Sequence, residues 1–151
     1  MAITGLVHVN VNCSDFERSL AFYEMLGFEL LMEAPETNTP EVAAAVGLEP
    51  YRIRAALMRL KDARFPFVID LIEWKHPSDA SPPYERLNHL GIARIAMASS
   101  DLDGDMARLQ AEGVEFISEP ATVPWEGGPD SRFVCFKDPD GSVLELVEML
   151  S

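Results

Sequence analysis

Two stretches of the chain repeat one another: residues 14–27 read SDFERSLAFYEMLG and residues 100–113 read SDLDGDMARLQAEG. In both, a Ser-Asp pair precedes apolar residues at helical spacing and a glycine ends the run. The two stretches keep a constant offset of 86 positions from the serine to the glycine. We therefore expect a helix in each, with Ser14 and Glu17 forming a capping box at the start of the first one.

Strand-like runs flank each expected helix. Residues 5–12 alternate Val with His or Asn, which is the period-2 pattern of a half-buried strand. Residues 91–98 form a similar run before the second helix. At the ends of the two halves, residues 67–73 match residues 142–148 at an offset of 75 positions.

The offset falls by 11 positions because the first half carries an insert at about residues 34–51. In this insert we expect a short helix that begins at Pro40. Each half also has room for two more strands between its helix and its last strand. These lie at about residues 29–32 and 53–60 in the first half, and at about 115–118 and 131–137 in the second.

Each half therefore has the order β-α-β-β-β, and we predict an α+β fold of two tandem βαβββ modules. We expect the modules to form a curved mixed sheet around a shared cleft, because neither half alone covers both faces of its sheet. A single domain spans residues 1–151, with module one at about 1–76 and module two at about 91–151. A Pro- and Ser-rich linker at about 77–90 joins them.

The bulk composition excludes several classes of protein. The chain has 151 residues and a net charge of −13, which argues against partners such as nucleic acids and anionic membranes, because both need clustered Lys and Arg. No apolar run approaches the roughly 20 residues of a membrane span. The two cysteines, Cys13 and Cys135, lack CxxC spacing and are expected to be free thiols. We expect a cytoplasmic protein.

The repeat also singles out four polar side chains in otherwise apolar strands. His8 is equivalent to Arg94 through the first offset, and Asp70 is equivalent to Glu145 through the second. Burying an unpaired charge is costly, so such positions need a partner, a metal ion or a water-filled cleft. His8, Asp70 and Glu145 together would suit a divalent metal such as Mn, Fe, Co, Ni or Zn.

Three motifs carry a resemblance to a known family. They are Val-His-Val at residues 7–9, Ser-Leu-Ala-Phe-Tyr at residues 19–23 with the following Leu-Gly-Phe, and Asp-Pro-Asp-Gly at residues 138–141 with the following Leu-Glu-Leu. Over nearly the whole chain the sequence resembles the vicinal oxygen chelate superfamily, which holds glyoxalase I, extradiol dioxygenases and bleomycin resistance proteins. The resemblance implies a small-molecule substrate or ligand and a homodimer.

The resemblance further implies that His8, Asp70, Arg94 and Glu145 match the four ligand positions of the metal-dependent members. Those members usually have His where this chain has Arg94, and an arginine cannot ligate a cation. Either Arg94 replaces the charge of the metal and clamps a carboxylate, phosphate or enolate, or a metal remains on the other three residues. His89 could supply the missing ligand, and a purely structural salt-bridge cluster is a further alternative.

The function expected from these features is that of a glyoxalase- or dioxygenase-type enzyme acting on a small oxygenated metabolite. A metal or cation in the cleft would stabilise an oxyanion while Glu145 moves a proton, and the reaction would be that of a lyase, isomerase or dioxygenase. An isomerase or epimerase could work with Arg94 in place of a metal. The alternative is a metal-free small-molecule binding protein of the bleomycin-resistance type.

Three further residues carry expectations of their own. Glu73 and Glu148 share the offset of the second match, and we expect them at edge or solvent positions. Trp125 lies in a Gly-containing loop that either closes over a ligand or packs on the body of the domain.

Overall fold

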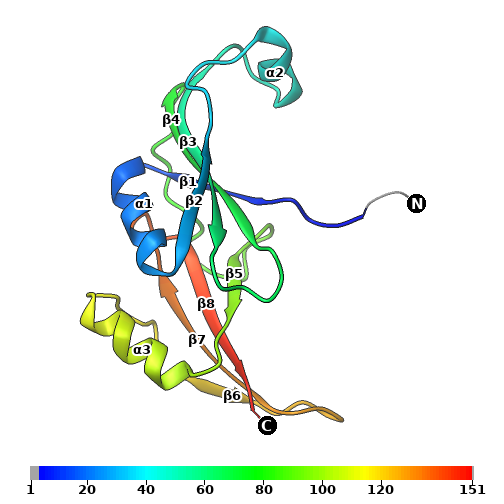
Figure 1. Cartoon of the computed structure of the whole chain (residues 1–151), viewed down its shortest axis with the longest axis vertical. Helices are drawn as coiled ribbons and strands as arrows, with labels where there is room; N and C mark the ends of the chain where they lie inside the picture. Colours follow the sequence, from blue (N-terminus) through cyan, green and yellow to red (C-terminus); the bar gives the residue numbers. More distant parts are fainter. Residues whose placement is uncertain (1–3, 151) are drawn as a thin grey trace. The chain divides into compact units, whose positions relative to one another are not determined.

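The computed structural model describes residues 4–150 of the chain, which divides into two compact units, residues 1–81 (unit 1) and 82–151 (unit 2). Unit 1 contains, in order, β1 (Val9–Cys13), α1 (Phe16–Met25), β2 (Phe28–Glu33), α2 (Pro40–Ala45), β3 (Arg52–Leu60) and β4 (Val68–His76) (Figure 1). Unit 2 contains β5 (Arg94–Ala98), α3 (Leu102–Ala111), β6 (Ala121–Val123), β7 (Ser131–Lys137) and β8 (Val143–Met149).

Each unit carries one four-stranded mixed sheet with the same strand order. In unit 1 the order is β1-β4-β3-β2, and in unit 2 it is β5-β8-β7-β6. The first strand of each unit pairs in parallel with the last, and the other pairs are antiparallel. The predicted α+β fold of two tandem βαβββ modules is confirmed, whereas the shared cleft stays a prediction.

The sequence repeat extends to the hydrogen-bond register. In unit 1 Asn10 lies opposite Asp70, and in unit 2 Ala96 lies opposite Glu145. These two pairs are related by the same offsets, 86 and 75, that relate the halves of the sequence. The first and last strands of both modules therefore meet in one register, and equivalent residues occupy equivalent places in the two sheets.

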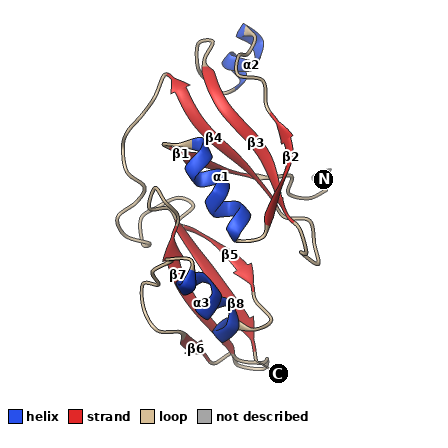
Figure 2. Cartoon of the chain, turned by 60° about the vertical axis from the view of Figure 1, so that its left-hand side comes forward, coloured by secondary structure: helices blue, strands red, loops and turns tan. Residues whose placement is uncertain are grey.

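One helix covers one face of the sheet in each unit (Figure 2). In unit 1, α1 buries Phe16 and Tyr23, and the Tyr23 ring meets the Phe28 ring edge to face with centroids 5.7 Å apart. Such pairs of buried aromatic side chains contribute a large part of the apolar stabilisation of a small core. The insert forms α2 as expected, with Thr39 capping it and Pro40 at its first turn.

The core of unit 2 lies between α3 and its sheet. The helix buries Leu102, Met106 and Leu109, while Val134, Phe136 and Leu144 are buried in the sheet. Since side chains alternate between the two faces of a strand, Cys135 and Glu145 point to the face opposite α3. This face holds the polar side chains discussed below.

The helices begin one residue later than the sequence pattern suggested. Asp15 Oδ1 accepts a hydrogen bond from Arg18 N at 3.0 Å, and Asp101 Oδ1 accepts one from Gly104 N at 2.9 Å. The expectation that Ser14 caps α1 was therefore wrong. The aspartate carboxylate satisfies the free amide three residues on, which is the usual task of an N-cap residue.

The two glutamates Glu73 and Glu148 have a structural task that the sequence analysis missed. Glu73 Oε2 accepts a hydrogen bond from Phe16 N at 3.1 Å, and Glu148 Oε1 accepts one from Leu102 N at 3.3 Å. Both carboxylates thus lie at the N-terminus of a helix, where an anion is stabilised by the helix dipole. The expectation of edge or solvent positions was wrong.

Several strand limits also differ from expectation. β1 begins at Val9 rather than residue 5, because its parallel partner β4 begins only at Val68. Residues 115–118 do not form a strand; Phe116 makes a single bridge to Phe136, and β6 is the edge strand instead. Within residues 4–150, no helix is both long enough and apolar enough to cross a membrane.

Candidate functional site

Unit 2 brings Arg94 and Glu145 together on the face of its sheet opposite α3. Arg94 begins β5 and Glu145 lies in the middle of β8, and the two strands are parallel neighbours. Arg94 Nε lies 2.6 Å from Glu145 Oε2 in an ion pair. The Glu145 side chain is 8% exposed and the Arg94 side chain 44% exposed, so the carboxylate is held inside and the guanidinium reaches solvent.

Cys135 holds the same carboxylate oxygen from the other side. It lies opposite Glu145 in the β7–β8 pair, and its thiol donates a hydrogen bond to Glu145 Oε2 at 3.6 Å. Burial and the charge of Glu145 raise the pKa of the Cys135 thiol, and Arg94 lowers it. The net effect is upward, so the thiol keeps its proton and remains a donor to Glu145.

The remaining polar atoms of the pair are available to a ligand. The Arg94 Nη atoms make no hydrogen bond or ion pair with any other of residues 4–150. In the same range Ser19 Oγ is the only enclosed side-chain nitrogen or oxygen that lacks a partner. No hydrogen bond to Glu145 Oε1 is seen among these residues either, so this oxygen is not fully enclosed. The pair offers a fork of N–H donors next to one carboxylate acceptor.

This arrangement in unit 2 does not fit a metal ion. Arg94 has only donor atoms, and its charge already neutralises Glu145 at 2.6 Å. A cation placed beside the guanidinium would be repelled. Over the part of the chain that the structure describes, no three or more His, Cys, Asp or Glu side chains are grouped so that they could hold a metal ion.

Unit 1 brings the other two predicted residues, His8 and Asp70, near each other. His8 is exposed and lies directly before β1, while Asp70 is half-buried in β4. Asn10 Nδ2 donates a hydrogen bond to Asp70 Oδ2 at 3.3 Å. Burial raises the pKa of Asp70, and the nearby His8 lowers it to a smaller extent. Metal binding by His8, Asp70 and Glu145 stays a prediction.

His89 makes contacts of its own in unit 2. Its ring stacks on Tyr84 with centroids 4.2 Å apart, and its Nδ1–H donates to the carbonyl oxygen of Leu90 at 2.8 Å. Of the two ring nitrogens, Nε2 is left for another partner. Its role as a replacement ligand stays a prediction.

Phe133 lies next to the pair and was not anticipated as part of the site, whereas Trp125, expected either to close over a ligand or to pack on the body of the domain, is hydrogen-bonded to β7. The Arg94 Cζ atom lies 5.9 Å from the centroid of the Phe133 ring, and Trp125 Nε1 donates to Ser131 Oγ at 2.8 Å. The signal that could have revealed Phe133 and Cys135 is the alternation along residues 131–137, but it required the register of that strand against β8.

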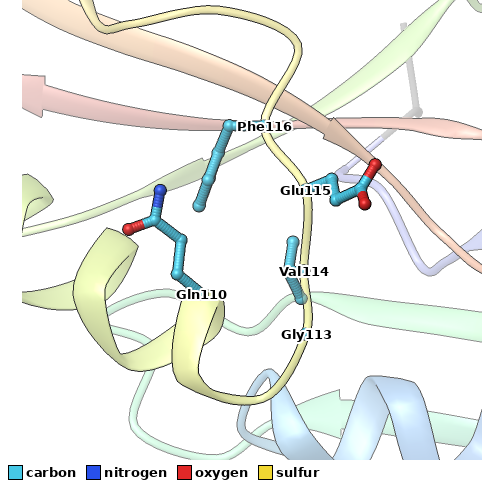
Figure 3. A pocket seen from close by; sticks show the side chains of 5 residues that line it. All are labelled: Gln110, Gly113, Val114, Glu115 and Phe116. Atoms are coloured by element: carbon cyan, nitrogen blue, oxygen red, sulfur yellow. The ribbon is translucent and has the colours of Figure 1, made fainter.

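A shallow hollow of about 540 Å³ lies elsewhere in unit 2, at the end of α3 (Figure 3). Gln110, Gly113, Val114, Glu115 and Phe116 line it. Phe116 packs on Phe136, which belongs to the helix-covered face of the sheet. The hollow is thus on the opposite face from Arg94 and Glu145, and its only charged lining residue is Glu115.

Comparison with known proteins shows the family to which the chain belongs. The model of the Glyoxalase/Bleomycin resistance protein/Dioxygenase superfamily matches residues 5–146. The uncharacterized protein YwkD of Bacillus subtilis is 30% identical over 150 residues, which cover 98% of this chain and 99% of YwkD.

Solved structures show the same fold. A glyoxalase family protein from Bacillus cereus matches with a TM-score of 0.78 and 24% identity, covering 100% of this chain and 99% of that one. TnmS3, an antibiotic binding protein from Streptomyces, matches with a TM-score of 0.66 and 28% identity, covering 99% of this chain and 98% of TnmS3.

Proposed function

Because this chain belongs to the glyoxalase/bleomycin resistance protein/dioxygenase superfamily, we propose that it is a glyoxalase-type enzyme that acts on a small oxygenated anion. Arg94 and Glu145 carry the chemistry. The observation that supports this most is their 2.6 Å ion pair, which leaves the Arg94 Nη atoms and Glu145 Oε1 for a ligand. The ligand carries a carboxylate, a phosphate or a group that becomes an enolate.

The two residues have complementary tasks in this proposal. Arg94 binds the anionic oxygens through its Nη donors and stabilises negative charge as it develops on a carbonyl oxygen. Glu145 Oε1 accepts the proton from the carbon next to that carbonyl and later returns it. Arg94 Nε and Cys135 Sγ both hold Oε2, so the carboxylate is oriented before the substrate arrives.

Members of this superfamily commonly bind divalent metal ions. In this chain the positive charge next to Glu145 is that of Arg94, and the proposed steps need no metal. A metal on His8, Asp70 and Glu145 is the alternative. In that case Glu145 would have to bind the metal through Oε1, since Oε2 is paired with Arg94.

Proton exchange tests the proposed chemistry without knowledge of the natural substrate. Pyruvate has a carboxylate for Arg94 and methyl protons next to a carbonyl. We expect the protein in D₂O to exchange these protons for deuterium faster than buffer does, as followed by proton NMR. Glu145→Gln should reduce the exchange by at least about 100-fold, because general base catalysis contributes roughly 10²–10⁴ in rate. Equal rates for the two proteins would contradict the assignment of Glu145.

A second candidate is a metal-free binding protein, which the similarity to the antibiotic binding protein TnmS3 over nearly the full chain favours. In this case Arg94 binds an anionic ligand and Glu145 only positions Arg94. Binding of small anions that depends on Arg94, without any proton exchange, would support this candidate against the enzyme.

The proposal includes a cytoplasmic homodimer. Exposed apolar residues before β1 favour a self-association surface, since Leu6 is 96% exposed and Val7 79% exposed. Sedimentation velocity should give about twice the chain mass of 16.7 kDa. A monomer at all concentrations would exclude the homodimer.

A further inference from the structure

Unit 2 presents an aromatic side chain directly beside the Arg94–Glu145 pair. Ser131, Phe133 and Cys135 share one face of β7 because alternate residues point the same way. Cys135 contacts Glu145, and the Arg94 guanidinium lies 5.9 Å from the centre of the Phe133 ring. The half-buried Phe133 ring is therefore on the same face as the charged pair and next to it.

Trp125 extends this apolar row beyond Phe133. Its indole Nε1 donates to Oγ of the buried Ser131 at 2.8 Å, and its backbone N donates to Asp130 Oδ1 at 3.3 Å. The side chain is nevertheless 55% exposed. A large ring that is held by a part-buried hydrogen bond and still faces solvent is a preformed surface for another flat group.

Beyond Arg94, the strand on the far side of β8 contributes only small residues to this face. Ala96 and Ala98 follow Arg94 at alternate positions of β5, and both are exposed. Ala98 lies opposite Val147, and Val147 lies opposite Phe133. An apolar surface thus leads from the charged pair towards Phe133, and after Arg94 no bulky side chain of β5 interrupts it.

We propose that the ligand of the Arg94 site is an aromatic or conjugated carboxylate or phosphate, whose anionic group binds Arg94 and whose flat body stacks on Phe133 and Trp125. This inference rests on the proposed function, because it assigns the anion to Arg94. A small ligand is favoured over an anionic polymer, since a chain with a net charge of −13 repels extended polyanions. The charged end and the apolar surface match a molecule that is charged at one end only.

A pair of probes tests the inference: 2-naphthoate, which has the flat body, and acetate, which has only the carboxylate. Titrations of the full chain are followed by two-dimensional NMR, with the indole N–H signal of Trp125 as a reporter. We expect 2-naphthoate to bind at least 10-fold more tightly than acetate. Phe133→Leu and Trp125→Leu should each weaken 2-naphthoate by about 3- to 10-fold and leave acetate unchanged.

The control is Phe65→Leu, which removes a 72% exposed aromatic ring in unit 1 and should change neither affinity. Comparable affinities for the two probes, or a 2-naphthoate affinity that neither unit 2 substitution reduces in folded protein, would overturn the inference. Arg94→Gln separates it from the proposed function. If Arg94→Gln leaves both affinities intact while the Leu variants still weaken 2-naphthoate, the anion is not bound by Arg94: the proposed function then fails, whereas the stacking of the flat body on Phe133 and Trp125 stands.

Discussion

Asp70 and Glu145 are equivalent carboxylates with different neighbours. Asp70 accepts a hydrogen bond from Asn10, whereas Ala96 occupies the position equivalent to Asn10 and leaves Glu145 to Arg94 and Cys135. Glu145 is therefore compensated by a full positive charge, while Asp70 has only an amide and the nearby His8. The two equivalent strand pairs therefore differ in the charge that surrounds their carboxylate, because a few neighbouring side chains differ.

This difference predicts an unusual pH dependence for Asp70→Asn. Burial raises the pKa of Asp70, so the folded protein holds this proton at a pH where the unfolded chain has lost it. The stability of the wild type then falls as the pH rises through the folded pKa, because ionised Asp70 is disfavoured in the folded state. The amide side chain of the variant accepts the same hydrogen bond from Asn10 without titrating.

We therefore expect Asp70→Asn to be more stable than the wild type at pH 7, by less than about 1 kcal/mol because the side chain is only half-buried. The gain should disappear as the pH falls below about 4, near the ordinary pKa of Asp. Urea unfolding at several pH values measures it. A variant that is less stable than the wild type at pH 7, with a difference that grows with pH, would contradict this reasoning.

Residue positions could be predicted from the sequence better than residue contacts. The offsets of the repeat identified His8, Asp70, Arg94 and Glu145 as special, and the structure brings them together as two pairs, one in each unit. The contact of Cys135 with Glu145 was not predictable. It depends on which residue of β7 lies opposite Glu145, and this register is set by the turn at residues 138–141.

At the scale of elements, both modules secure the start of their helix in the same way. An aspartate caps the helix, and a glutamate of the last strand accepts a hydrogen bond from the first helical N–H. In addition, an arginine of the third strand of the module pairs with an acidic residue in the first turn of the helix. The arginine contacts are Arg54 with Glu17 and Arg132 with Asp103. This repeated arrangement joins the helix to the sheet at its N-terminus, where negative charge is favoured.

The capping residues can be compared directly in α3. Replacing Asp101 by Ala should destabilise the protein by about 0.5–2 kcal/mol, the usual cost of losing an N-cap side chain. Ser100→Ala, one residue earlier, should change stability by less than about 0.5 kcal/mol, as is typical of surface substitutions. Thermal unfolding of both variants shows which residue caps the helix. A larger loss of stability in Ser100→Ala than in Asp101→Ala would identify the serine as the cap.

The elements themselves could be predicted from periodicity, but their ends could not. The helical spacing and the terminal glycines located α1 and α3, and Gly27 and Gly113 have positive φ values of 101° and 88°, as expected at the C-terminal end of a helix. β1 begins later than its alternation suggested because a strand needs a partner, and β4 starts at Val68. The alternation of apolar residues reports burial, and it cannot report where the neighbouring strand begins.

At the scale of the whole molecule, the charge of the chain makes Arg94 stand out. A protein with a net charge of −13 repels small anions at long range. An anion site therefore needs a local positive charge with free donors, and Arg94 provides one at a fixed position in the sheet. The superfamily fold can serve enzymes and binding proteins alike, so the function depends on this site rather than on the fold.

The most direct test of this account is the affinity of methylphosphonate for chelator-treated protein, measured by NMR titration for the wild type, Arg94→Gln and Arg86→Gln. Arg86 is an exposed arginine of unit 2 and forms no ion pair with Glu145, so it serves as the matched control. We expect saturable binding to the wild type and to Arg86→Gln, and at least a 10-fold loss in Arg94→Gln. Two results would contradict the account. One is equal affinity of the wild type and Arg94→Gln; the other is a wild type that binds methylphosphonate only after a divalent metal is added.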